Sequence, residues 1–427
     1  MLPLGSVCED IFQGVTIKPG DSEDPIVLKV KNIRGDEGID FSDVEHARDV
    51  PERKHLRSGD LISPFIGEAI RQINFAIFHE TKGQYTVDGN TGVIRPHAAK
   101  VSAEYLQNWF QSSFGRLQIL RLIGGGGVPF LGAHNVAKLV VAAPPLRTQR
   151  ELVAAMDAAR AERRVKLAEA DALLAGLDGF LLATLGLTPP PKDDRKVFAA
   201  TLASVRGRAD ADFHSPRFRS IREGIEAGKY PARSLAQLCS RFESGFAAGR
   251  QDQAFDYTLG VPHLRPLNLN AQGEISLENT KFVPKNSVQP RDYCELGEVL
   301  FNNTNSAEMV GKSTVFEFEQ PCACSNHMTR LRVREGNSAH YLAAIFNMLR
   351  RLGYLGLLAT KFNNQAGINL DTLTPLRVPA PPPAVQERIA TEARRRREAA
   401  RRLRAEAETG WQAAKRWFEE QLLGGVK

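Results

Sequence analysis

The sequence of 427 residues lacks several features that would place it in a special class of protein. It contains no run of about 18 uninterrupted apolar residues, which argues against a transmembrane helix. Its first residues lack the basic head and the apolar core of a secretory signal peptide. Its five cysteines follow no regular spacing, which indicates reduced thiols rather than a disulfide framework. These absences predict a cytoplasmic chain that has no membrane partner.

Catalytic and cofactor-binding motifs are also missing. The glycine run 124–127 lacks the Gly-Lys-Ser/Thr ending of a phosphate-binding loop, and residues 311–313, which have that ending, lack the glycine five positions upstream. No Asn-Pro-Pro-aromatic, His-Glu-x-x-His or Gly-x-Ser-x-Gly motif is present. Cys322, Cys324 and His327 are metal-ligating residue types, but no second pair with zinc-like spacing accompanies them. The sequence therefore predicts no catalytic role, no cofactor and no metal.

The composition is that of an ordinary globular protein with a modest basic excess. Hydrophobic residues make up 42% of the chain, which is enough to give two or three domains a packed core. The 56 basic and 49 acidic residues leave a formal net charge of +7. This excess permits a polyanionic partner without requiring one.

The chain contains an internal repeat. Residues 3–14 recur in pattern at 233–245, and residues 56–62 recur at 294–300. The clearest pair is APPLRTQ at 143–149 and APPPAVQ at 380–386. In both copies a charged, alanine-rich stretch of good helix formers follows at once. The repeated module is therefore a globular part, a prolyl stop and a long helix.

Each predicted long helix carries an apolar stripe. In the first helix the stripe steps by three and four residues, as in a coiled-coil seam, through Leu167, Ala170, Leu174, Leu177 and Leu181. In the second it comprises Ile389, Ala393, Ala400, Leu403, Ala407, Trp411, Ala414, Phe418 and Leu422. A stripe of this kind has to be buried, so we expect the two helices to pair, in antiparallel fashion if the modules are related by a pseudo-two-fold axis. A rod of about 60 Å would then space the two modules, although periodicity alone is equally typical of helices that dimerise or pack in a bundle.

A basic run on the second helix has two interpretations. Arg394 to Arg397, with Arg401, Arg402 and Arg404, would contact DNA phosphates or an acidic partner surface. Runs of this kind more often form one solvated helix face, whose arginine stems cover apolar neighbours. We favour the solvated face.

The predicted fold class is α+β, with two tandem mixed α/β modules joined by two long helices that pair as an antiparallel coiled coil. Strands are expected at 25–30, 60–63, 298–301 and 314–318, and shorter helices at 103–112 and 339–351. The predicted domains are a first module at 1–145, its helix at 146–187, a linker at 188–215, a second module at 216–383 and its helix at 384–427.

Polar loops after the predicted strands supply candidate binding residues. Asparagine and glutamine pair bidentately with adenine, and arginine or lysine with guanine, so such loops suit the reading of DNA bases, although many surface loops share this composition. The candidate DNA-contacting residues are Arg71, Gln72, Asn303, Asn305, Ser306, Lys312, Asn363 and Asn364.

In this arrangement the chain resembles the specificity subunits of type I restriction–modification systems over nearly its whole length. The resemblance is carried by the two Pro-Pro junctions at 144–149 and 381–386, each of which opens a long helix. Residues 297–305 with 310–313 look like the family's strand-and-loop signature, and 365–369 with Leu373 like its late signature. Residues 208–213 look like the lead-in to its second recognition domain. Thr148 and Val385 stand where the family usually has glutamate, and the first copy fits the strand-and-loop signature weakly.

The resemblance implies a non-catalytic subunit in which two target-recognition domains read the two halves of a split site in double-stranded DNA. It also implies that the helical spacer docks two methyltransferase subunits, which bind S-adenosylmethionine, and leaves open whether restriction/translocase subunits join them. Three alternatives remain: a coiled-coil adaptor, a detached piece of a fused methyltransferase–nuclease, and the recognition subunit of a related phage-defence methylation system without restriction.

Overall fold

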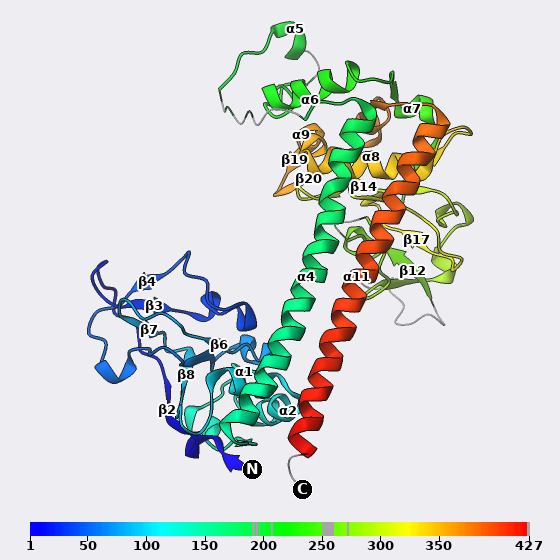
Figure 1. Cartoon of the computed structure of the whole chain (residues 1–427). Coiled ribbons are helices and arrows are strands. Elements are labelled where there is room, and N and C mark those ends of the chain that lie inside the picture. The colour runs from blue at the N-terminus through cyan, green and yellow to red at the C-terminus, as the bar shows by residue number, and fades with distance from the viewer. Residues whose placement is uncertain are drawn as a thin grey trace. The chain divides into compact units, whose positions relative to one another are not determined.

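The computed structural model describes residues 1–189, 193, 195, 197–205, 208–249, 260–270 and 273–424. The chain divides into two compact units (Figure 1). Unit 1 comprises Met1–Leu167 and Arg404–Lys427, and unit 2 comprises Ala168–Leu403. Each unit therefore contains one segment of each long helix.

Unit 1 is a mixed α/β module. Its strands are β1 (Leu2–Pro3), β2 (Cys8–Gln13), β3 (Ile26–Leu28), β4 (Glu45–His46), β5 (Leu61–Pro64), β6 (Ala76–Ile77), β7 (Tyr85–Val87), β8 (Thr91–Pro96) and β9 (Val140–Val141). Its helices are α1 (Ala103–Gln111), α2 (Ser113–Leu122), α3 (Ala133–Val136) and the first part of α4 (Leu146–Leu185), with short 3-10 turns such as η5 (Glu68–Gln72).

Unit 2 has the same kinds of element in a similar order. Its strands are β10 (Ala232–Ser234), β11 (Cys239–Ser244), β12 (Gly260–Leu264), β13 (Lys281–Pro284), β14 (Val299–Asn302), β15 (Thr304–Asn305), β16 (Ser313–Val315), β17 (Ala323–Cys324), β18 (Met328–Val333), β19 (Thr360–Phe362), β20 (Gln365–Gly367) and β21 (Arg377–Pro379). Its helices are α5 (Leu202–Val205), α6 (Pro216–Glu226), α7 (Leu235–Leu238), α8 (Ala339–Arg351), α9 (Tyr354–Leu358), α10 (Leu370–Leu373) and the first part of α11 (Pro383–Gly424).

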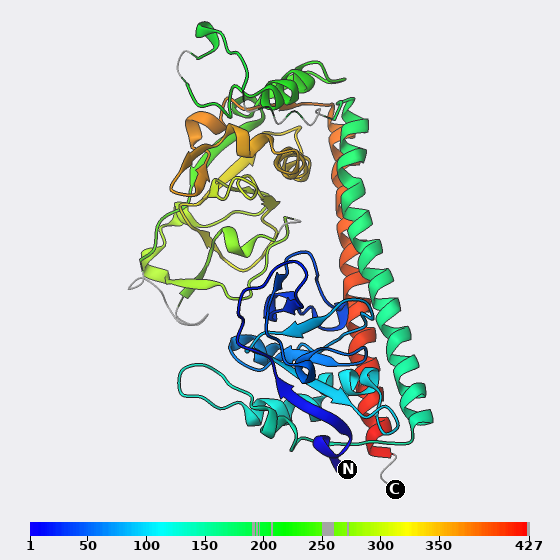
Figure 2. The same ribbon diagram turned by 90° about the vertical axis from the view of Figure 1, so that its left-hand side faces the viewer.

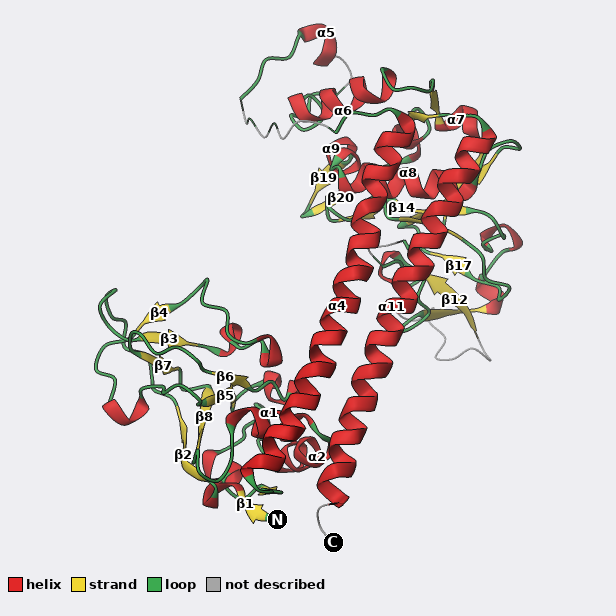
Figure 3. Ribbon diagram, viewed as in Figure 1, coloured by secondary structure: helices red, strands yellow, loops and turns green. Residues whose placement is uncertain are grey.

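The sheets repeat the same topology in the two units (Figure 3). The four-stranded antiparallel sheet runs β2-β8-β5-β6 in unit 1 and β11-β18-β14-β16 in unit 2. Even the register irregularity recurs, between Cys8 and Asp10 in β2 and between Cys239 and Arg241 in β11. A smaller sheet (β4-β3-β7 or β13-β12-β17) contains one parallel pair in each unit. The sequence repeat is thus a repeat of structure.

The segments of α4 and α11 lie side by side in each unit and run in opposite directions (Figures 1 and 2). In unit 1, Lys166 of α4 pairs with Glu406 of α11 at 3.6 Å, and the Arg160 guanidinium lies 5.3 Å from the ring centre of Trp411. In unit 2, the Arg396 guanidinium of α11 lies 5.4 Å from the ring centre of Phe180 of α4. As the residue number rises along α4, that of its α11 neighbour falls.

The stripes expected from the sequence are largely buried. Ala170, Leu177 and Leu181 of α4 are at most 3% exposed, and the two leucines join the core of unit 2. Trp411 and Phe418 of α11 join the core of unit 1, against α1 and the sheet. The apolar periodicity thus packs each helix against both its partner helix and a globular module.

The observed elements differ in detail from the expected ranges. Helix α4 occupies Leu146–Leu185 where 146–187 was expected, and α11 occupies Pro383–Gly424 where 384–427 was expected, residues 425–427 lying outside the described residues. The expected strand at 314–318 is shorter, because β16 ends at Val315. No helix in the described part of the chain is long and apolar enough to span a membrane.

Candidate nucleic-acid interface

A small sheet in unit 2 brings together polar residues that lie far apart in the sequence. Strand β15 pairs with β20, which places Asn305 opposite Ala366, and β20 pairs with β19, which places Ala366 opposite Lys361. The loop after β14 and the late hairpin therefore lie on adjacent strands. We call this pair of segments, residues 303–306 and 360–367, the paired-loop site of unit 2.

The tip of its hairpin presents two asparagines to solvent. Phe362 pairs with Gln365, so Asn363 and Asn364 form a two-residue turn. Both have positive φ angles, 42° and 62°, which a type I′ turn requires and asparagine tolerates. Both side chains are exposed. The local backbone therefore holds two exposed carboxamides on a tight turn.

Two of the predicted contact residues in unit 2 are buried instead. Lys312 is 7% exposed, and its ammonium donates hydrogen bonds to the carbonyls of Pro266 at 3.0 Å and Leu269 at 2.5 Å. Burial lowers the pKa of this ammonium. Asn303, also 7% exposed, donates through Nδ2 to the Asn326 carbonyl and the Thr329 hydroxyl. These bonds favour structural roles for Lys312 and Asn303, whereas Asn305 and Ser306 are half-buried on the loop itself.

Unit 1 builds an equivalent site from two segments that backbone hydrogen bonds bring together. The Gly67 amide donates to the Pro129 carbonyl at 2.9 Å, and the Leu131 amide donates to the Phe65 carbonyl at 2.8 Å. The loop after β5 thus lies against the segment that follows α2, as β15 lies against β20. We call residues 65–72 and 124–131 the paired-loop site of unit 1.

Arg71 and Gln72 end the 3-10 turn η5 at this site. Both are exposed. The Arg71 guanidinium pairs with Glu68 at 3.0 Å, and the Gln72 side-chain carbonyl accepts a hydrogen bond from Asn74 at 3.1 Å. Exposed pairs of this kind contribute little to stability, so neither contact prevents the side chain from binding a ligand.

Some residues of the two sites were not among the candidate contact residues chosen from the sequence. Lys361 and Gln365 flank the asparagine turn in unit 2, and the ring of Phe362 is 46% exposed beside them. Val128 and Phe130, which are 60% and 43% exposed, occupy the tip in unit 1. The signal available in the sequence was an Asn-Asn pair between two short segments that can form strands. Asparagine tolerates the positive φ angles of a tight hairpin turn, so such a pair is typical of a hairpin.

Two buried glutamines anchor the long helices beside these modules. The Gln149 Oε1 accepts the Ser102 amide at 3.0 Å, and its Nε2 donates to the carbonyls of Lys100 at 2.9 Å and Pro144 at 2.8 Å. Gln386 makes the matching bonds to the Ser338 amide at 2.8 Å and the Pro381 carbonyl at 2.9 Å. Because Ser102 and Ser338 cap α1 and α8, each glutamine joins the start of a long helix to the helix on its module. This is the physical role of the repeated Pro-Pro motif.

A buried ion pair supports the main sheet in each unit. In unit 1, Arg95 of β8 binds Asp60 through two nitrogens, at 2.9 and 2.8 Å, and both residues are below 10% exposed. In unit 2, Arg330 of β18 lies 3.6 Å from Glu298. Asp60 directly precedes β5 and Glu298 directly precedes β14, the strands that lead into the two paired-loop sites. Each ion pair therefore helps to fix the start of the strand from which the loop follows.

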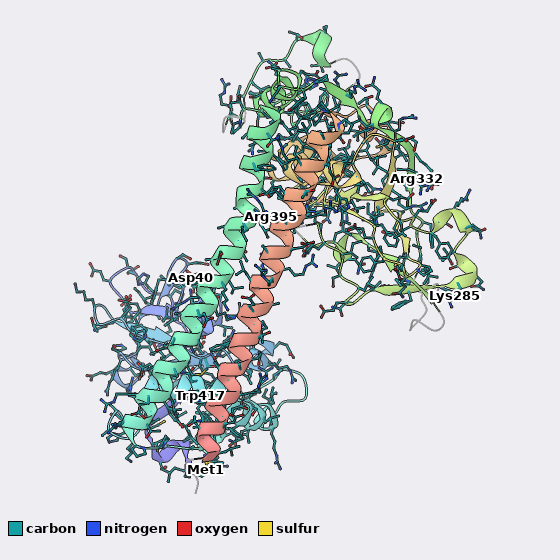
Figure 4. The ribbon with its side chains drawn as sticks, turned by 45° about the vertical axis from the view of Figure 1, so that its right-hand side comes forward. Met1, Asp40, Lys285, Arg332, Arg395 and Trp417 are labelled. Carbon is teal, nitrogen blue, oxygen red and sulfur yellow. The ribbon has the colours of Figure 1, made fainter. Side chains whose placement is uncertain are left out.

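The basic run on α11 is largely compensated by neighbouring carboxylates. Arg395, labelled in Figure 4, pairs with Glu392 at 2.7 Å, Arg394 pairs with Glu387 at 3.0 Å, and Arg401 with Glu274 at 3.3 Å. These contacts favour the solvated helix face over a phosphate-binding one. Cys322 and Cys324 lie in the core whereas His327 is exposed, and burial raises the pKa of Cys322 to about 11.

No protein-family model and no curated protein matches the chain. Solved structures do. A chain from a structure of the assembly and conformational transition of a type I restriction–modification system is 18% identical, with a TM-score of 0.57, and the match covers 99% of this chain and 95% of that one. This chain has the fold of a type I restriction–modification protein.

Two further solved chains are similar over the same extent. The HsdS subunit from Thermoanaerobacter tengcongensis is 16% identical at a TM-score of 0.40, with 99% of this chain and 94% of that one covered. The type I restriction–modification system S subunit from M. genitalium is 8% identical at a TM-score of 0.46, with 99% and 95% covered. Within the restriction–modification fold of this chain, the two paired-loop sites occupy equivalent places in the two units.

Proposed function

We propose that the chain is the specificity subunit of a type I restriction–modification system, which recognises a bipartite site in double-stranded DNA and catalyses no reaction itself. The observation that carries this proposal is the duplication of one module, each copy with a paired-loop site, in a chain of that fold. Two copies of one DNA-recognition module suit a target that consists of two half-sites.

The chemistry of the two sites supports base reading. In unit 2 the candidate contacts are amides, those of Asn305, Asn363 and Asn364, and a carboxamide pairs bidentately with adenine. In unit 1 the candidate is Arg71, whose guanidinium matches the two acceptors on the guanine edge. We propose that residues 304–306 and the hairpin of unit 2 read one half-site, and that residues 65–72 and 124–131 of unit 1 read the other.

The long helices supply the proposed spacer. We propose that α4 and α11 pair as an antiparallel coiled coil, and that two methyltransferase subunits, which hold the S-adenosylmethionine, dock beside it. The assembly would act in the cytoplasm, with or without restriction/translocase subunits. The ion pair between Lys166 and Glu406 and the buried stripes of both helices support this pairing.

The test is a map of methylated bases in a host strain that lacks other methylation, with this chain and its methyltransferase expressed together. The wild-type chain should produce methylation at one split motif. Asn305→Ala and Asn363→Ala should lower methylation about 5- to 150-fold, the range for loss of one bidentate contact worth about 1–3 kcal/mol. They should relax the base preference at positions in one half of the motif only, whereas Arg71→Ala should relax the base preference in the other half.

Gln320→Ala is the matched control, because this exposed amide of unit 2 lies outside both sites and outside α4 and α11. It should leave the map unchanged. Wild-type methylation with no defined motif, or DNA binding that depends on salt but not on sequence, would contradict the proposal and support a coiled-coil adaptor.

A further inference from the structure

Each paired-loop site carries one exposed phenylalanine ring. Among the phenylalanine, tyrosine and tryptophan side chains that the structure describes, the two most exposed are Phe362 of β19, at 46%, and Phe130 of unit 1, at 43%. A single exposed apolar residue is ordinary on a protein surface. The recurrence of an exposed ring in both copies of one site indicates a role in binding rather than in stability.

The backbone hydrogen bonds show which positions of the two sites correspond. In unit 1 the residue after Phe130 donates its amide to the carbonyl of the first residue after β5, at 2.8 Å. In unit 2 the residue after Gly367 donates its amide to the carbonyl of the first residue after β14, also at 2.8 Å. Because β5 and β14 are equivalent strands of the repeated sheet, Phe130 and Gly367 occupy equivalent positions. Both face away from the core, because the preceding residues, Pro129 and Ala366, are buried and successive residues of a strand alternate between its faces.

The Phe362 ring lies in the place that this glycine leaves open. A Cβ atom added to Gly367 would lie 2.9 Å from Cε1 and 3.4 Å from Cζ of Phe362. The far end of the ring therefore rests on the backbone of β20, the strand beside its own (Figure 1). In unit 1 the Phe130 side chain projects from the equivalent position. Two different strands thus supply a phenyl group to the same outward face of the paired-loop site.

Both rings lie along the surface of their site. A Cβ atom added to Gly132 would lie 3.1 Å from Cε1 and 3.3 Å from Cζ of Phe130, so this ring also has its far end against a glycine backbone. A side chain that inserts between base pairs acts as a wedge, and a wedge needs its far end free. A ring whose far end rests on the backbone instead offers one side to a partner that approaches the surface.

The residues beside the rings indicate which apolar group meets them. Asn363 and Asn364 directly follow Phe362 on the hairpin turn, and their exposed carboxamides suit adenine. In unit 1, Gln72 is the exposed carboxamide of the site. Every adenine of a duplex is paired with thymine, whose C5-methyl is the apolar group of the major groove, and phenylalanine is one of the residues that contact it. A carboxamide and a phenyl group in one site therefore match the two bases of an A·T pair.

We propose that Phe362 and Phe130 are specificity-determining residues, each of which contacts the C5-methyl group of a thymine in the half-site that its unit reads. This inference rests on the function proposed above and adds to it a selection for thymine. The ring selects against cytosine at the same position, because cytosine lacks the methyl group and its amino group would lose hydrogen bonds to water against a phenyl surface.

The test is a titration of duplex DNA with the purified complex of this chain and its methyltransferase. The duplexes carry the motif from the methylation map, with either thymine or deoxyuridine, which lacks only the C5-methyl group, in one half-site at a time. The wild-type complex should bind each thymine duplex about fourfold more tightly, which is the effect of burying one methyl-sized group. Phe362→Ala should abolish this preference in the half-site whose base preference Asn363→Ala relaxes, and Phe130→Ala should abolish it in the other.

Phe41→Ala is the matched control, because Phe41 is a phenylalanine of unit 1 that is 38% exposed and lies outside both sites. It should keep the thymine preference in both half-sites. A merely structural role of Phe362 or Phe130 would weaken binding to the thymine and deoxyuridine duplexes equally. The ratio of the two dissociation constants therefore reports the contact with the methyl group and not the folding of the site.

A second measurement uses the wild-type chain alone in its complex, with no substitution. Duplexes that carry 5-iododeoxyuridine, in which iodine replaces the methyl group, are irradiated, and the crosslinked residue is identified by mass spectrometry. The expected crosslinks are to Phe362 from one half-site and to Phe130 from the other. Crosslinks to other residues, or a thymine preference that survives removal of the rings, would overturn the inference and leave the specificity-subunit function intact. Equal wild-type affinity for the motif and for a scrambled duplex would overturn that function and this inference with it.

Discussion

Replacement of Gln149 by leucine should destabilise unit 1 selectively. The Gln149 side chain is fully buried and makes three hydrogen bonds that join the start of α4 to the cap of α1 and to the Pro-Pro junction. Leucine has nearly the same size but can neither donate nor accept. The substitution therefore removes the bonds while largely keeping the packing.

The expected loss of stability follows from the backbone groups that would lose their hydrogen-bond partner. The Ser102 amide and the carbonyls of Lys100 and Pro144 lose their side-chain partner in a buried place. A buried polar group without its partner costs about 1–3 kcal/mol, and part of this is recovered by relaxation or water. We therefore expect the free energy of unfolding of unit 1 to fall by about 3–5 kcal/mol, a large part of the stability of an ordinary domain.

The chain provides a selective probe for this measurement. Its three tryptophans, Trp109, Trp411 and Trp417, all lie in unit 1, and Trp417 is labelled in Figure 4. Urea unfolding followed by tryptophan fluorescence therefore reports on unit 1. Gln149→Leu should move this transition to a lower urea concentration. Gln386→Leu breaks the equivalent contact in unit 2 and should shift the far-UV circular dichroism transition more than the fluorescence one.

Gln412→Leu serves as the control, because it makes the same chemical change on the exposed face of α11 and should alter stability by no more than about 0.5 kcal/mol. A change below about 1 kcal/mol for Gln149→Leu would refute the reasoning. It would mean that the repeated glutamine is not what joins each helix to its module.

Two other perturbations test the interior of the modules. Asp60→Leu should lower the free energy of unfolding of unit 1, measured by fluorescence, by about 3–5 kcal/mol, because it leaves the buried Arg95 guanidinium without its carboxylate. Adding Arg95→Met should recover part of that loss. A double variant less stable than the single one would contradict this assignment. Burial raises the pKa of Cys8 and of Cys239 to about 12 from an ordinary 9.0, so folding favours the neutral thiols. Stability should hold below pH 9 and decline as the pH rises toward 12, and Cys8→Ala with Cys239→Ala should flatten the decline in melting temperature between pH 8 and pH 10.5.

The sequence was most informative where one physical constraint dominates. The two Pro-Pro junctions and the apolar stripes predicted the start of α4 at Leu146 and a helix start within one residue of Pro383. Strand β5 and helix α8 lie where alternation and helical spacing predicted them. In each case a local pattern of burial or a prolyl stop decides the structure, and such patterns are visible without tertiary contacts.

Side-chain roles were harder to predict because they depend on long-range contacts. Lys312 follows a glycine in a polar stretch of sequence that is typical of a surface loop. Its ammonium nevertheless donates hydrogen bonds to the carbonyls of Pro266 and Leu269, which lie 46 and 43 residues away in the chain. The partnership of β15 with β20 also depends on pairing across about 60 residues, which no periodicity encodes. Loop composition suggested Asn305 and Asn364 as candidate contacts, but only the structure shows that their segments pair with the same strand, β20, or border it.

The division of both long helices between the units has a consequence for synthesis on the ribosome. Unit 2 lies between the two segments of unit 1, and the core of unit 1 contains Trp411, Phe418 and Leu422, which are translated after the whole of unit 2. A nascent chain therefore holds residues 1–167 without the helix segment that closes their core for as long as unit 2 is being synthesised. We expect the module whose synthesis begins first to reach its final packing last.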